Sequence, residues 1–209
     1  MLSAGAAQAS PELIINGGFE TAGAPGYATF NSDYSTGVDA HAENTVNIGS
    51  NPISLHGSWD SFAPYAGSEM LIVNGGANVN STVWSQTLAL SAGTYNFSAL
   101  ASSVYSGNPA TLRAVATIGG IDYTLGTDLL LTSATNAWNT FGGSMTVLTA
   151  GNVTLKLQDR NAVASGNDFA VDNISLTSAV PEPETYAMLL AGLGLVGFMS
   201  RRKSAKKAA

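Results

Sequence analysis

Cysteine is absent from the 209-residue chain, and charged side chains make up only 11% of it, about half the usual share. Without cysteine, the chain cannot form disulfides, zinc–thiolate sites, iron–sulfur clusters or a cysteine nucleophile. Residues 1–180 have three basic residues against twelve acidic ones, so 3 − 12 gives this part a formal charge of −9. The three basic residues are Arg113, Lys156 and Arg160. Such an acidic body repels phosphate backbones, and we therefore expect no nucleic-acid binding.

Signatures of catalysis are also missing. The chain has only two histidines, His41 and His56, and their spacing does not match a metal-binding pair. It has no Gly-x-Ser-x-Gly elbow, P-loop or dinucleotide-binding fingerprint. Carboxylates that meet only in the folded protein can hydrolyse glycosides, so this reaction stays open as an alternative. We interpret the loop acids Asp33, Asp39 and Glu43 as solvated, and the sequence predicts a protein that is not an enzyme.

The other five basic residues lie in the last nine positions, behind an uncharged apolar run over residues 186–199. Fourteen helical residues span about 21 Å at ~1.5 Å each, which is less than a hydrocarbon core of about 30 Å. Snorkelling side chains and local thinning of the bilayer reduce the difference between the length of the helix and the thickness of the core. A helix buried on one side would carry a polar stripe, which this run lacks. We therefore predict a transmembrane-like helix over 186–200, with the basic residues 201–209 in the cytoplasm and the body exported.

A proline-rich stretch over residues 179–185 precedes this helix, and it contains Pro181, Glu182 and Pro183. Proline–glutamate–proline, a short apolar span and a basic cluster occur here in that order, over about residues 180–203. The arrangement resembles the PEP-CTERM sorting signal of Gram-negative bacteria. The resemblance implies that an exosortase in the inner membrane recognises and processes the tail, which releases the protein to the surface or the exopolysaccharide matrix. The resemblance also implies that Pro181, Glu182 and Pro183 are the sorting motif. It assigns the role of basic anchor to Arg201, Arg202 and Lys203.

The first ten residues fit the end of a secretory signal. Ala7-Gln8-Ala9 before Ser10 has the small-x-small pattern that signal peptidase requires. Residues 1–6 contain neither a basic region nor an apolar region of adequate length. We therefore interpret residues 1–10 as the remainder of a signal peptide whose true start lies upstream. An ordinary flexible tail is the alternative.

The body, residues 11–178, has short alternating runs between Gly, Asn, Ser and Asp clusters and no helical periodicity. About ten such runs predict an all-β fold, an antiparallel β-sandwich or jelly roll. We interpret Gly/Asn/Ser-rich residues 21–52 as a mobile connection or a recognition loop. The strand candidates are Leu13–Asn16, Met70–Asn74, Val83–Leu90, Thr94–Ala99, Leu112–Ile118, Ile121–Leu125, Ala137–Leu148, Asn152–Gln158 and Phe169–Thr177.

The segments that open and close the body, residues 13–20 and 167–176, resemble the first and last strands of galactose-binding-like jelly rolls, which include many carbohydrate-binding modules. Residues 67–75 and 83–87 resemble intermediate segments of the same group. In that fold the opening glutamate and closing aspartate often bind a structural Ca²⁺, which implies such a role for Glu20 and Asp172. Calcium takes several oxygen ligands, and we consider Glu69 or Asp168 as further ligands. Alternatively, Glu20 and Asp172 are solvated or accept hydrogen bonds from turn amides.

Carbohydrate recognition needs exposed aromatic platforms and hydrogen-bonding groups. Trp59 and Tyr65 lie in loop sequence and are our ligand candidates, although capping of the core is the alternative for both. Trp84 and Tyr95 share strand faces with aliphatic residues, and we predict that both are core residues. The remaining large aromatic candidates are Tyr34, Tyr105 and Trp138, of which we assign Trp138 to the core because it begins a strand before Phe141.

These observations lead to one main hypothesis. We expect an exported, non-catalytic protein that associates with polysaccharide outside the cell after its C-terminal tail has been processed. Structural calcium is the only cofactor expected. The alternative is a structural matrix or surface protein that has no defined sugar site.

Overall fold

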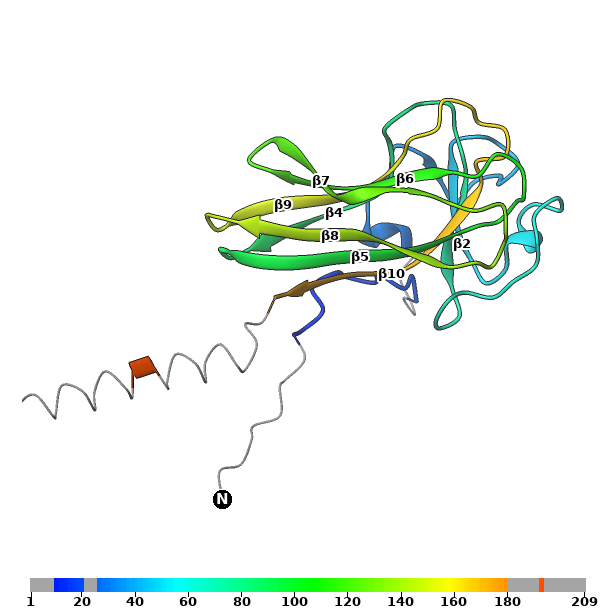
Figure 1. Ribbon diagram of the computed structural model, residues 1–209. Coiled ribbons are helices and arrows are strands. Elements are labelled where there is room, and N and C mark those ends of the chain that lie inside the picture. Colours follow the sequence, from blue (N-terminus) through cyan, green and yellow to red (C-terminus); the bar gives the residue numbers. More distant parts are fainter. Residues whose placement is uncertain (1–9, 21–25, 180–191, 194–209) are drawn as a thin grey trace, which may run out of the picture. The chain divides into compact units, whose positions relative to one another are not determined.

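The structure is a computed structural model, and it describes residues 10–20, 26–179 and 192–193. Pro11–Ser178 form a compact unit, in which two β-sheets face each other (Figure 1). Both hydrophobic clusters and the pairing between the strands lie inside this unit. Pro11–Ser178 therefore contain their own core, which is the property of a domain that folds by itself.

The first sheet has six strands in the order β1-β2-β3-β10-β5-β8. Its neighbours are antiparallel except for β1 and β2, which run parallel over two residues. The bounds of its strands are β1 Ser35–Thr36, β2 Thr45–Gly49, β3 Met70–Asn74, β10 Phe169–Ser178, β5 Gly93–Ser103 and β8 Asn139–Val147.

The second sheet has four antiparallel strands in the order β4-β9-β6-β7. Two short 3₁₀ helices, η1 Gly26–Thr29 and η2 Pro52–Ser54, lie in the connections. The bounds of its strands are β4 Ser81–Leu90, β9 Gly151–Asp159, β6 Thr111–Ile118 and β7 Ile121–Leu130. The predicted all-β sandwich is confirmed, because nearly every pair of neighbouring strands in the two facing sheets is antiparallel.

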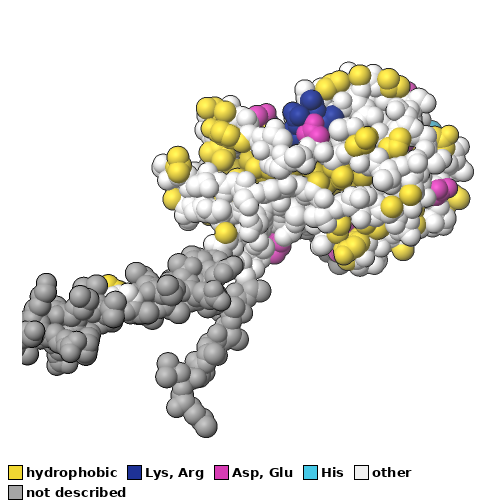
Figure 2. Space-filling view, viewed as in Figure 1, with side chains coloured by type: hydrophobic (Ala, Val, Ile, Leu, Met, Phe, Trp, Pro, Cys, Tyr) yellow, Lys and Arg dark blue, Asp and Glu magenta, His cyan; other side chains and the backbone are white. Residues whose placement is uncertain are grey.

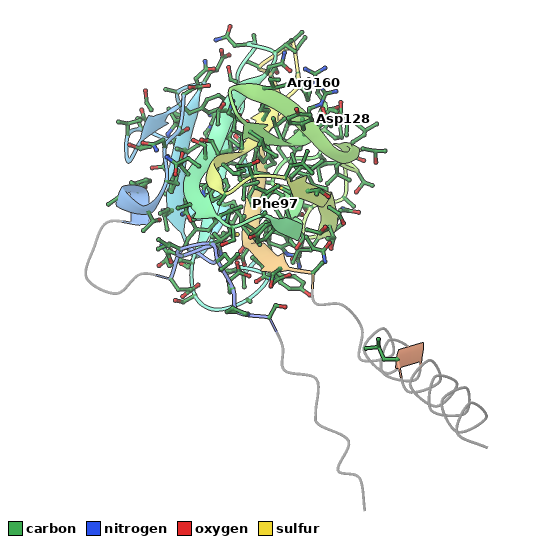
Figure 3. The ribbon with its side chains drawn as sticks, turned by 90° about the vertical axis from the view of Figure 1, so that its left-hand side faces the viewer. Phe97, Asp128 and Arg160 are labelled. Atoms are coloured by element: carbon green, nitrogen blue, oxygen red, sulfur yellow. The ribbon has the colours of Figure 1, made fainter. Side chains whose placement is uncertain are left out.

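Alternation along the strands builds the main core between the sheets. On β5, Tyr95, Phe97 and Ala99 are buried, while the residues between them are not. Phe97 lies in the interior (Figure 3) and stacks on Trp84 of the opposite sheet, with ring centroids 6.4 Å apart. The predicted core positions of Trp84 and Tyr95 are therefore confirmed. The inward residues of β9 are buried in the same way: Val153, Leu155 and Leu157.

Two segments differ from the sequence prediction. Residues 21–52 were expected to lack regular structure, yet they contain β1 and β2, because β2 provides backbone hydrogen bonds to the fully buried strand β3. Leu13–Asn16 is not a strand. The Leu13 N–H donates to the Leu176 carbonyl at 3.0 Å as well as to the Glu12 carboxylate, but the N–H groups of Ile14 and Ile15 donate to the side chains of Glu12 and Gln86, which takes those donors away from a ladder. Only a single bridge joins Glu12 to Thr177.

Most of the predicted sorting tail lies outside the described residues. Of the helix expected over residues 186–200, the structure describes Gly192 and Leu193, which are helical. Pro181, Glu182 and Pro183, the basic residues 201–203 and the predicted signal-peptide remnant over residues 1–9 are not described. Among the described residues, no helix has the length and apolarity that crossing a bilayer requires.

Candidate functional site

The outer face of the six-stranded sheet, which points away from the main core, carries a second hydrophobic cluster. Alternation along β3 turns Met70 and Ile72 to this face, and both are buried. Trp59 and Phe62 come from the segment between β2 and β3 and cover them, together with Ala170 of β10. The segment that follows β2 therefore packs on the outside of the sheet and brings its aromatic side chains there.

Hydrogen bonds hold this segment in place. The indole N–H of Trp59 donates to Asp168 Oδ2 over 3.2 Å, and the backbone N–H of Asp60 donates to the carbonyl of Val104 over 2.9 Å. Thr135 donates its hydroxyl to the Asp60 carboxylate at 2.6 Å. These contacts bind the segment to the beginning of β10 and to the connections that follow β5 and β7.

Tyr65 and Trp138 form an aromatic pair at the surface of this cluster. Tyr65 is 53% exposed, and its ring meets the half-buried ring of Trp138 at a centroid distance of 6.0 Å and an interplanar angle of 67°. Trp138 also contacts Phe62 edge to face at 6.1 Å, and its indole N–H donates to Asn136 Oδ1 over 3.2 Å. The pair thus combines accessible aromatic surface with a fixed orientation.

Polar side chains without charge continue this face along β5 and β8. Asn96, Thr140 and Ser144 alternate with buried residues that point into the core, and all three are exposed. Ser144 donates its hydroxyl to the side-chain carbonyl of Asn96 over 2.7 Å, across the pair of strands. Trp138 directly precedes β8, so the aromatic pair lies at one end of a strip of hydroxyl and amide groups.

Glu20 and Asp172 lie together at the edge of the segment that carries Tyr65. A Cβ atom on Gly18 would be 3.6 Å from Glu20 Cγ and 3.8 Å from Asp172 Oδ1. Glu20 accepts the N–H groups of Ser68 and Glu69, each over 2.6 Å. Although desolvation acts in the opposite direction, these and the Ser68 hydroxyl hold the pKa of the Glu20 carboxyl below its ordinary value.

Asp172 is fully buried, and this burial raises the pKa of its carboxyl. Repulsion from Glu20 raises the same pKa further. The Asp172 oxygens accept the N–H groups of Ala66 at 3.0 Å and Asn173 at 2.6 Å. Among the described residues, no base forms an ion pair with either carboxylate, and two such adjacent carboxylates suit an oxygen-binding divalent cation. Within the described ranges, however, no three His, Asp or Glu residues come together as a metal site. Further ligands would have to be carbonyls, hydroxyls or water.

The two further acids considered for this site are used differently. Glu69 donates its backbone N–H to Glu20. Asp168 directly precedes β10 and lies four residues before Asp172. It accepts hydrogen bonds from the Gly75 N–H at 3.1 Å and from the Trp59 indole. The structure therefore brings together Glu20 and Asp172 and assigns Asp168 to the anchoring of Trp59.

Trp59 is not the exposed platform that the loop sequence indicated. It is 3% exposed and packs in the second cluster, with His56 stacked on it at 4.8 Å. Its ring fills the outer face of β3 and β10, and its only polar group is satisfied by Asp168. Tyr34 is also buried and donates its hydroxyl to Asp159 Oδ2 over 3.0 Å, so its ring is not available to a ligand.

Trp138 was predicted to pack in the core but lies on the opposite face. In an extended strand, residues three positions apart point to opposite sides. Phe141 points into the main core, so Trp138 points outward to the second cluster. This parity was visible in the sequence, and it was the signal that could have placed Trp138 on the outer face.

All three basic residues of the body lie on the outer side of the four-stranded sheet, and each faces an acid of β7. Arg113 donates to both carboxylate oxygens of Asp128 over 2.6 and 2.7 Å, and Arg160 Nε lies 3.5 Å from the same carboxylate. Lys156 binds Asp122 at 3.1 Å. Figures 2 and 3 show this mixed cluster on one face. The hydrogen bond from Arg113 lowers the pKa of Asp128. The body therefore offers no unpaired basic side chain among its described residues.

Residues 179–203 match the family model of the PEP-CTERM protein-sorting motif. This chain carries a PEP-CTERM sorting motif. The matched range includes Pro181, Glu182 and Pro183 and extends through the basic cluster to Lys203, as the sequence predicted. The motif implies an exported protein that is processed at the membrane. No curated protein matches the chain.

Several solved structures share the fold of the body that precedes this motif, at low sequence identity. The CBM22-1 xylan-binding domain from Paenibacillus barcinonensis Xyn10C matches with a TM-score of 0.55 and 15% identity, over 84% of this chain and 99% of that one. TmCBM61 in complex with β-1,4-galactotriose matches with a TM-score of 0.53 and 15% identity, over 81% of this chain and 100% of that one. These likenesses identify the body as a β-sandwich of the carbohydrate-binding-module type.

The same fold occurs in enzymes. A cyclase from Fischerella sp. TAU matches with a TM-score of 0.58 and 12% identity, over 83% of this chain and 99% of that one. The sorting motif indicates an exported protein, and the likenesses show the fold of its body. The fold alone does not determine whether such a protein is catalytic, because one fold hosts many functions.

Proposed function

We propose that this protein is an exported, non-catalytic polysaccharide-binding protein, and that its binding face is the outer side of the six-stranded sheet. The aromatic pair of Tyr65 and Trp138, next to the uncharged strip on β5 and β8, is the observation that carries the proposal. The C–H faces of a sugar ring pack on aromatic rings, and hydroxyl and amide groups bind sugar hydroxyls. Both elements lie side by side on this face.

The contacts of the pair support binding with little reorganisation. Trp138 is held by Phe62 and by its hydrogen bond to Asn136, and the backbone that follows Tyr65 is held by the bond from Ala66 to Asp172. A platform that is already ordered loses less conformational entropy when a ligand binds. The arrangement therefore favours recognition of an extended sugar chain by a largely preformed surface.

The acids near this face support a role without catalysis. Glycoside hydrolysis needs one carboxyl group that donates a proton and a second that acts as base or nucleophile. Asp60 accepts the Thr135 hydroxyl, and buried Asp172 accepts two backbone N–H groups. Both carboxylates are committed to hydrogen bonds that shape the face, and Glu20, the acid beside Asp172, is itself bound by the N–H groups of Ser68 and Glu69.

A structural Ca²⁺ bound by Glu20 and Asp172 belongs to this proposal. Such an ion would neutralise two adjacent carboxylates, one of which is buried. The same carboxylates accept the N–H groups of Ala66, Ser68 and Glu69. Calcium would therefore order the segment that carries Tyr65, without contacting the sugar.

Sorting completes the proposal. Pro181, Glu182 and Pro183 would be recognised by an exosortase in the inner membrane of a Gram-negative bacterium, with Arg201, Arg202 and Lys203 as the cytoplasmic anchor. Processing would then release the acidic body to the cell surface or the extracellular matrix. The body would act there without the basic tail.

The test is binding of residues 11–178 to soluble xylan and galactan, measured by affinity electrophoresis and calorimetry with calcium present. We expect Tyr65→Ala and Trp138→Ala each to weaken binding at least tenfold. Tyr105→Ala is the matched control, since Tyr105 is 40% exposed and belongs to neither cluster. If all three variants bound as tightly as the unchanged protein, the proposed face would be contradicted.

The second candidate is a structural matrix protein without a sugar site. The observation that favours it is the surface of β5 and β8, which presents Ser, Thr and Asn side chains with no charge. Such a surface is compatible with bulk presence in a hydrated matrix. Absence of binding to every polysaccharide of a broad glycan panel, by a folded and calcium-loaded body, would favour this candidate.

A further inference from the structure

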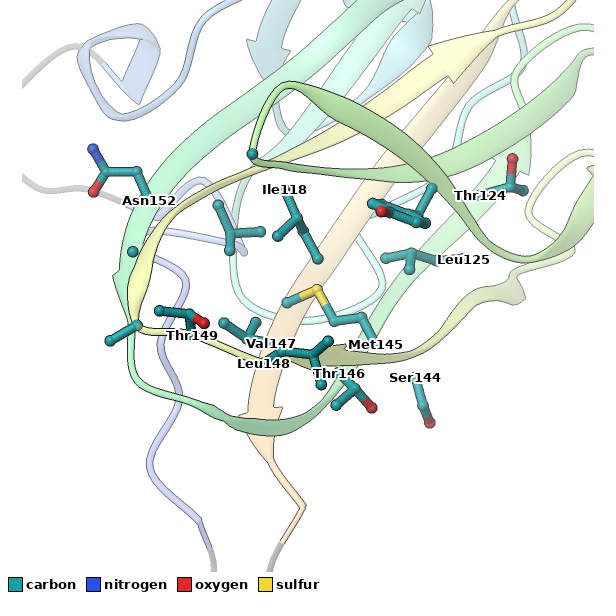
Figure 4. A pocket seen from close by; sticks show the side chains of 15 residues that line it. Ile118, Thr124, Leu125, Ser144, Met145, Thr146, Val147, Leu148, Thr149 and Asn152 are labelled. Atoms are coloured by element: carbon teal, nitrogen blue, oxygen red, sulfur yellow. The ribbon is translucent and has the colours of Figure 1, made fainter.

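A cavity of about 720 Å³ opens between the two sheets, at the end of the sandwich formed by the β6–β7 and β8–β9 turns (Figure 4). It is separate from the proposed sugar face, because it lies between the sheets and not on the outer surface. Its volume lies within the range of roughly 300–1,000 Å³ that is typical of small-molecule sites. Six of its lining residues are aliphatic or aromatic: Ile118, Tyr123, Leu125, Met145, Val147 and Leu148.

The inner end of the cavity is set by the backbone. β7 and β8 are the edge strands of the two sheets, and they approach each other so closely that a Cβ on Gly126 would overlap the carbonyl oxygen of Gly142. Both glycines have positive φ angles, +71° and +125°, which a residue with a side chain adopts only with strain. The neighbouring residues Leu125 and Met145 line the cavity, so it begins directly beside this fixed contact.

No charged side chain lines the cavity, and the hydroxyl groups of β8 do not point into it. No Asp, Glu, Lys or Arg lines it, although the body carries a net charge of −9. Ser144 and Thr146 of β8 point away from it, as Figure 4 shows, and they bind Asn96 and Thr94 on the outer face at 2.7 and 3.5 Å. Met145 and Val147, which alternate with them along β8, point inward.

We propose that this cavity binds the acyl chain of a lipid. An uncharged, apolar wall stabilises a hydrocarbon chain by removing it from water. It suits a sugar less well: its polar lining groups outside β8 are Tyr123, Thr124, Thr149 and Asn152, so most of the hydroxyls of a sugar would lose hydrogen bonds to water without gaining partners. The sorting motif implies processing at the membrane, where acyl chains are the apolar groups that the protein meets.

The mouth of the cavity fits the same occupant. Leu148 is 86% exposed at the β8–β9 turn, and Tyr123 on the opposite wall is 48% exposed. Figure 2 shows apolar side chains exposed at this end of the body. A chain that enters between these two residues would cover apolar surface that otherwise faces water, which is the usual meaning of such a patch.

The experiment uses residues 11–178, which contain their own core and lack the apolar tail that would itself bind detergent. Dodecyl maltoside, below its critical micelle concentration, is titrated into the protein by calorimetry, and maltose is titrated separately. We expect one dodecyl maltoside per body and no binding of maltose. Val147→Phe, which fills the cavity, and Leu148→Asn, which makes its mouth polar, are each expected to weaken binding at least tenfold.

Leu130→Asn is the matched control, because Leu130 is 67% exposed and does not line the cavity. It should bind like the unchanged protein. Because Leu148 is exposed, its variant is expected to fold even where Val147→Phe does not. Binding that survives Leu148→Asn, or that maltose reproduces, would overturn the proposal. Loss of binding in Tyr65→Ala would also overturn it, by assigning the maltose headgroup to the sugar face. A concentration-dependent dimer that Leu148→Asn abolishes would make this end an interface between copies instead.

Discussion

Tyr65 and Trp138 lie edge to face on the outer side of the six-stranded sheet, with ring centroids 6.0 Å apart. Tyr65 comes from the segment between β2 and β3, whereas Trp138 directly precedes β8. The two residues meet because Phe62 and Trp59 fix the intervening segment on β3 and β10. Their contact gives the proposed sugar face a partly exposed aromatic pair.

The first prediction separates binding from stability at Trp138. Trp138→Ala should weaken xylan or galactan binding and also lower the free energy of unfolding by about 1–2 kcal/mol, less than for a fully buried tryptophan. Trp138→Phe should keep the ring packing and recover most of both properties. Urea unfolding and calorimetry on the same samples provide the measurements. An alanine variant that unfolds earlier but binds normally would mean that Trp138 only packs.

The second prediction concerns calcium. Calcium at one hundred times its dissociation constant should raise the free energy of unfolding by about 2.7 kcal/mol. Asp172→Asn should remove this response, because the buried carboxylate is lost. Asp122→Asn is the matched control, since Asp122 binds Lys156 on the other sheet. Melting temperatures with calcium and with chelator measure the effect. If the melting temperature were the same with calcium and with chelator, calcium would no longer be part of the proposal.

The third prediction is a pH dependence without calcium. Burial raises the pKa values of Asp159, Asp168 and Asp172 above their ordinary values. The unfolded chain therefore releases these protons at lower pH than the folded protein does, and stability falls as pH rises toward the folded pKa values. In chelator, the body should be more stable near pH 5 than near pH 8.

The opposite sign applies at lower pH. The pKa values of Asp122 and Asp128 are lowered, first by hydrogen bonds from Thr117 and Arg113 respectively. Their contribution is present above the unfolded pKa and disappears as the pH falls through the folded pKa. Urea unfolding as a function of pH should therefore give a maximum in the mildly acidic range. Stability that rises steadily from pH 5 to pH 8 would contradict the effect of the buried acids.

The fourth prediction concerns the charge of the polysaccharide. The body is acidic, and its three bases are each held by β7 acids on the sheet opposite to the proposed face. Neutral chains should therefore bind with little dependence on salt, and uronate-rich or sulfated chains should not bind at low salt. Titrations at about 0.02 and 0.5 M salt would test this. Tighter binding of the acidic polymer would be the contrary result.

The fifth prediction addresses sorting. Replacement of Pro181 and Pro183 by alanine in the full chain should leave the protein in the membrane fraction, because the motif is then no longer recognised. Glu184→Gln, directly after Pro-Glu-Pro, keeps the motif and should be released normally. Immunoblots of membrane and extracellular fractions measure the distribution. Normal release of the double variant would show that these prolines are not required.

Much of the body was predictable because its signals are local. The alternation of Val153, Leu155 and Leu157 defines the inner face of β9 without knowledge of its neighbours. β2 was missed because its five residues carry little alternation and depend on pairing with β3. Trp59 was misjudged because a tryptophan in loop sequence looks the same whether it faces solvent or covers a sheet.

Four properties could be derived from the amino-acid sequence: the sorting motif, the absence of thiol chemistry, the acidity of the body and its all-β character. Each of these depends on residue type and on short-range spacing. Three relationships became known only from the folded protein: Trp138 meets Tyr65, Glu20 and Asp172 share the space beside Gly18, and a cavity opens beside Gly126. These relationships join residues far apart in the chain, and their geometry depends on which strands pair and in which register.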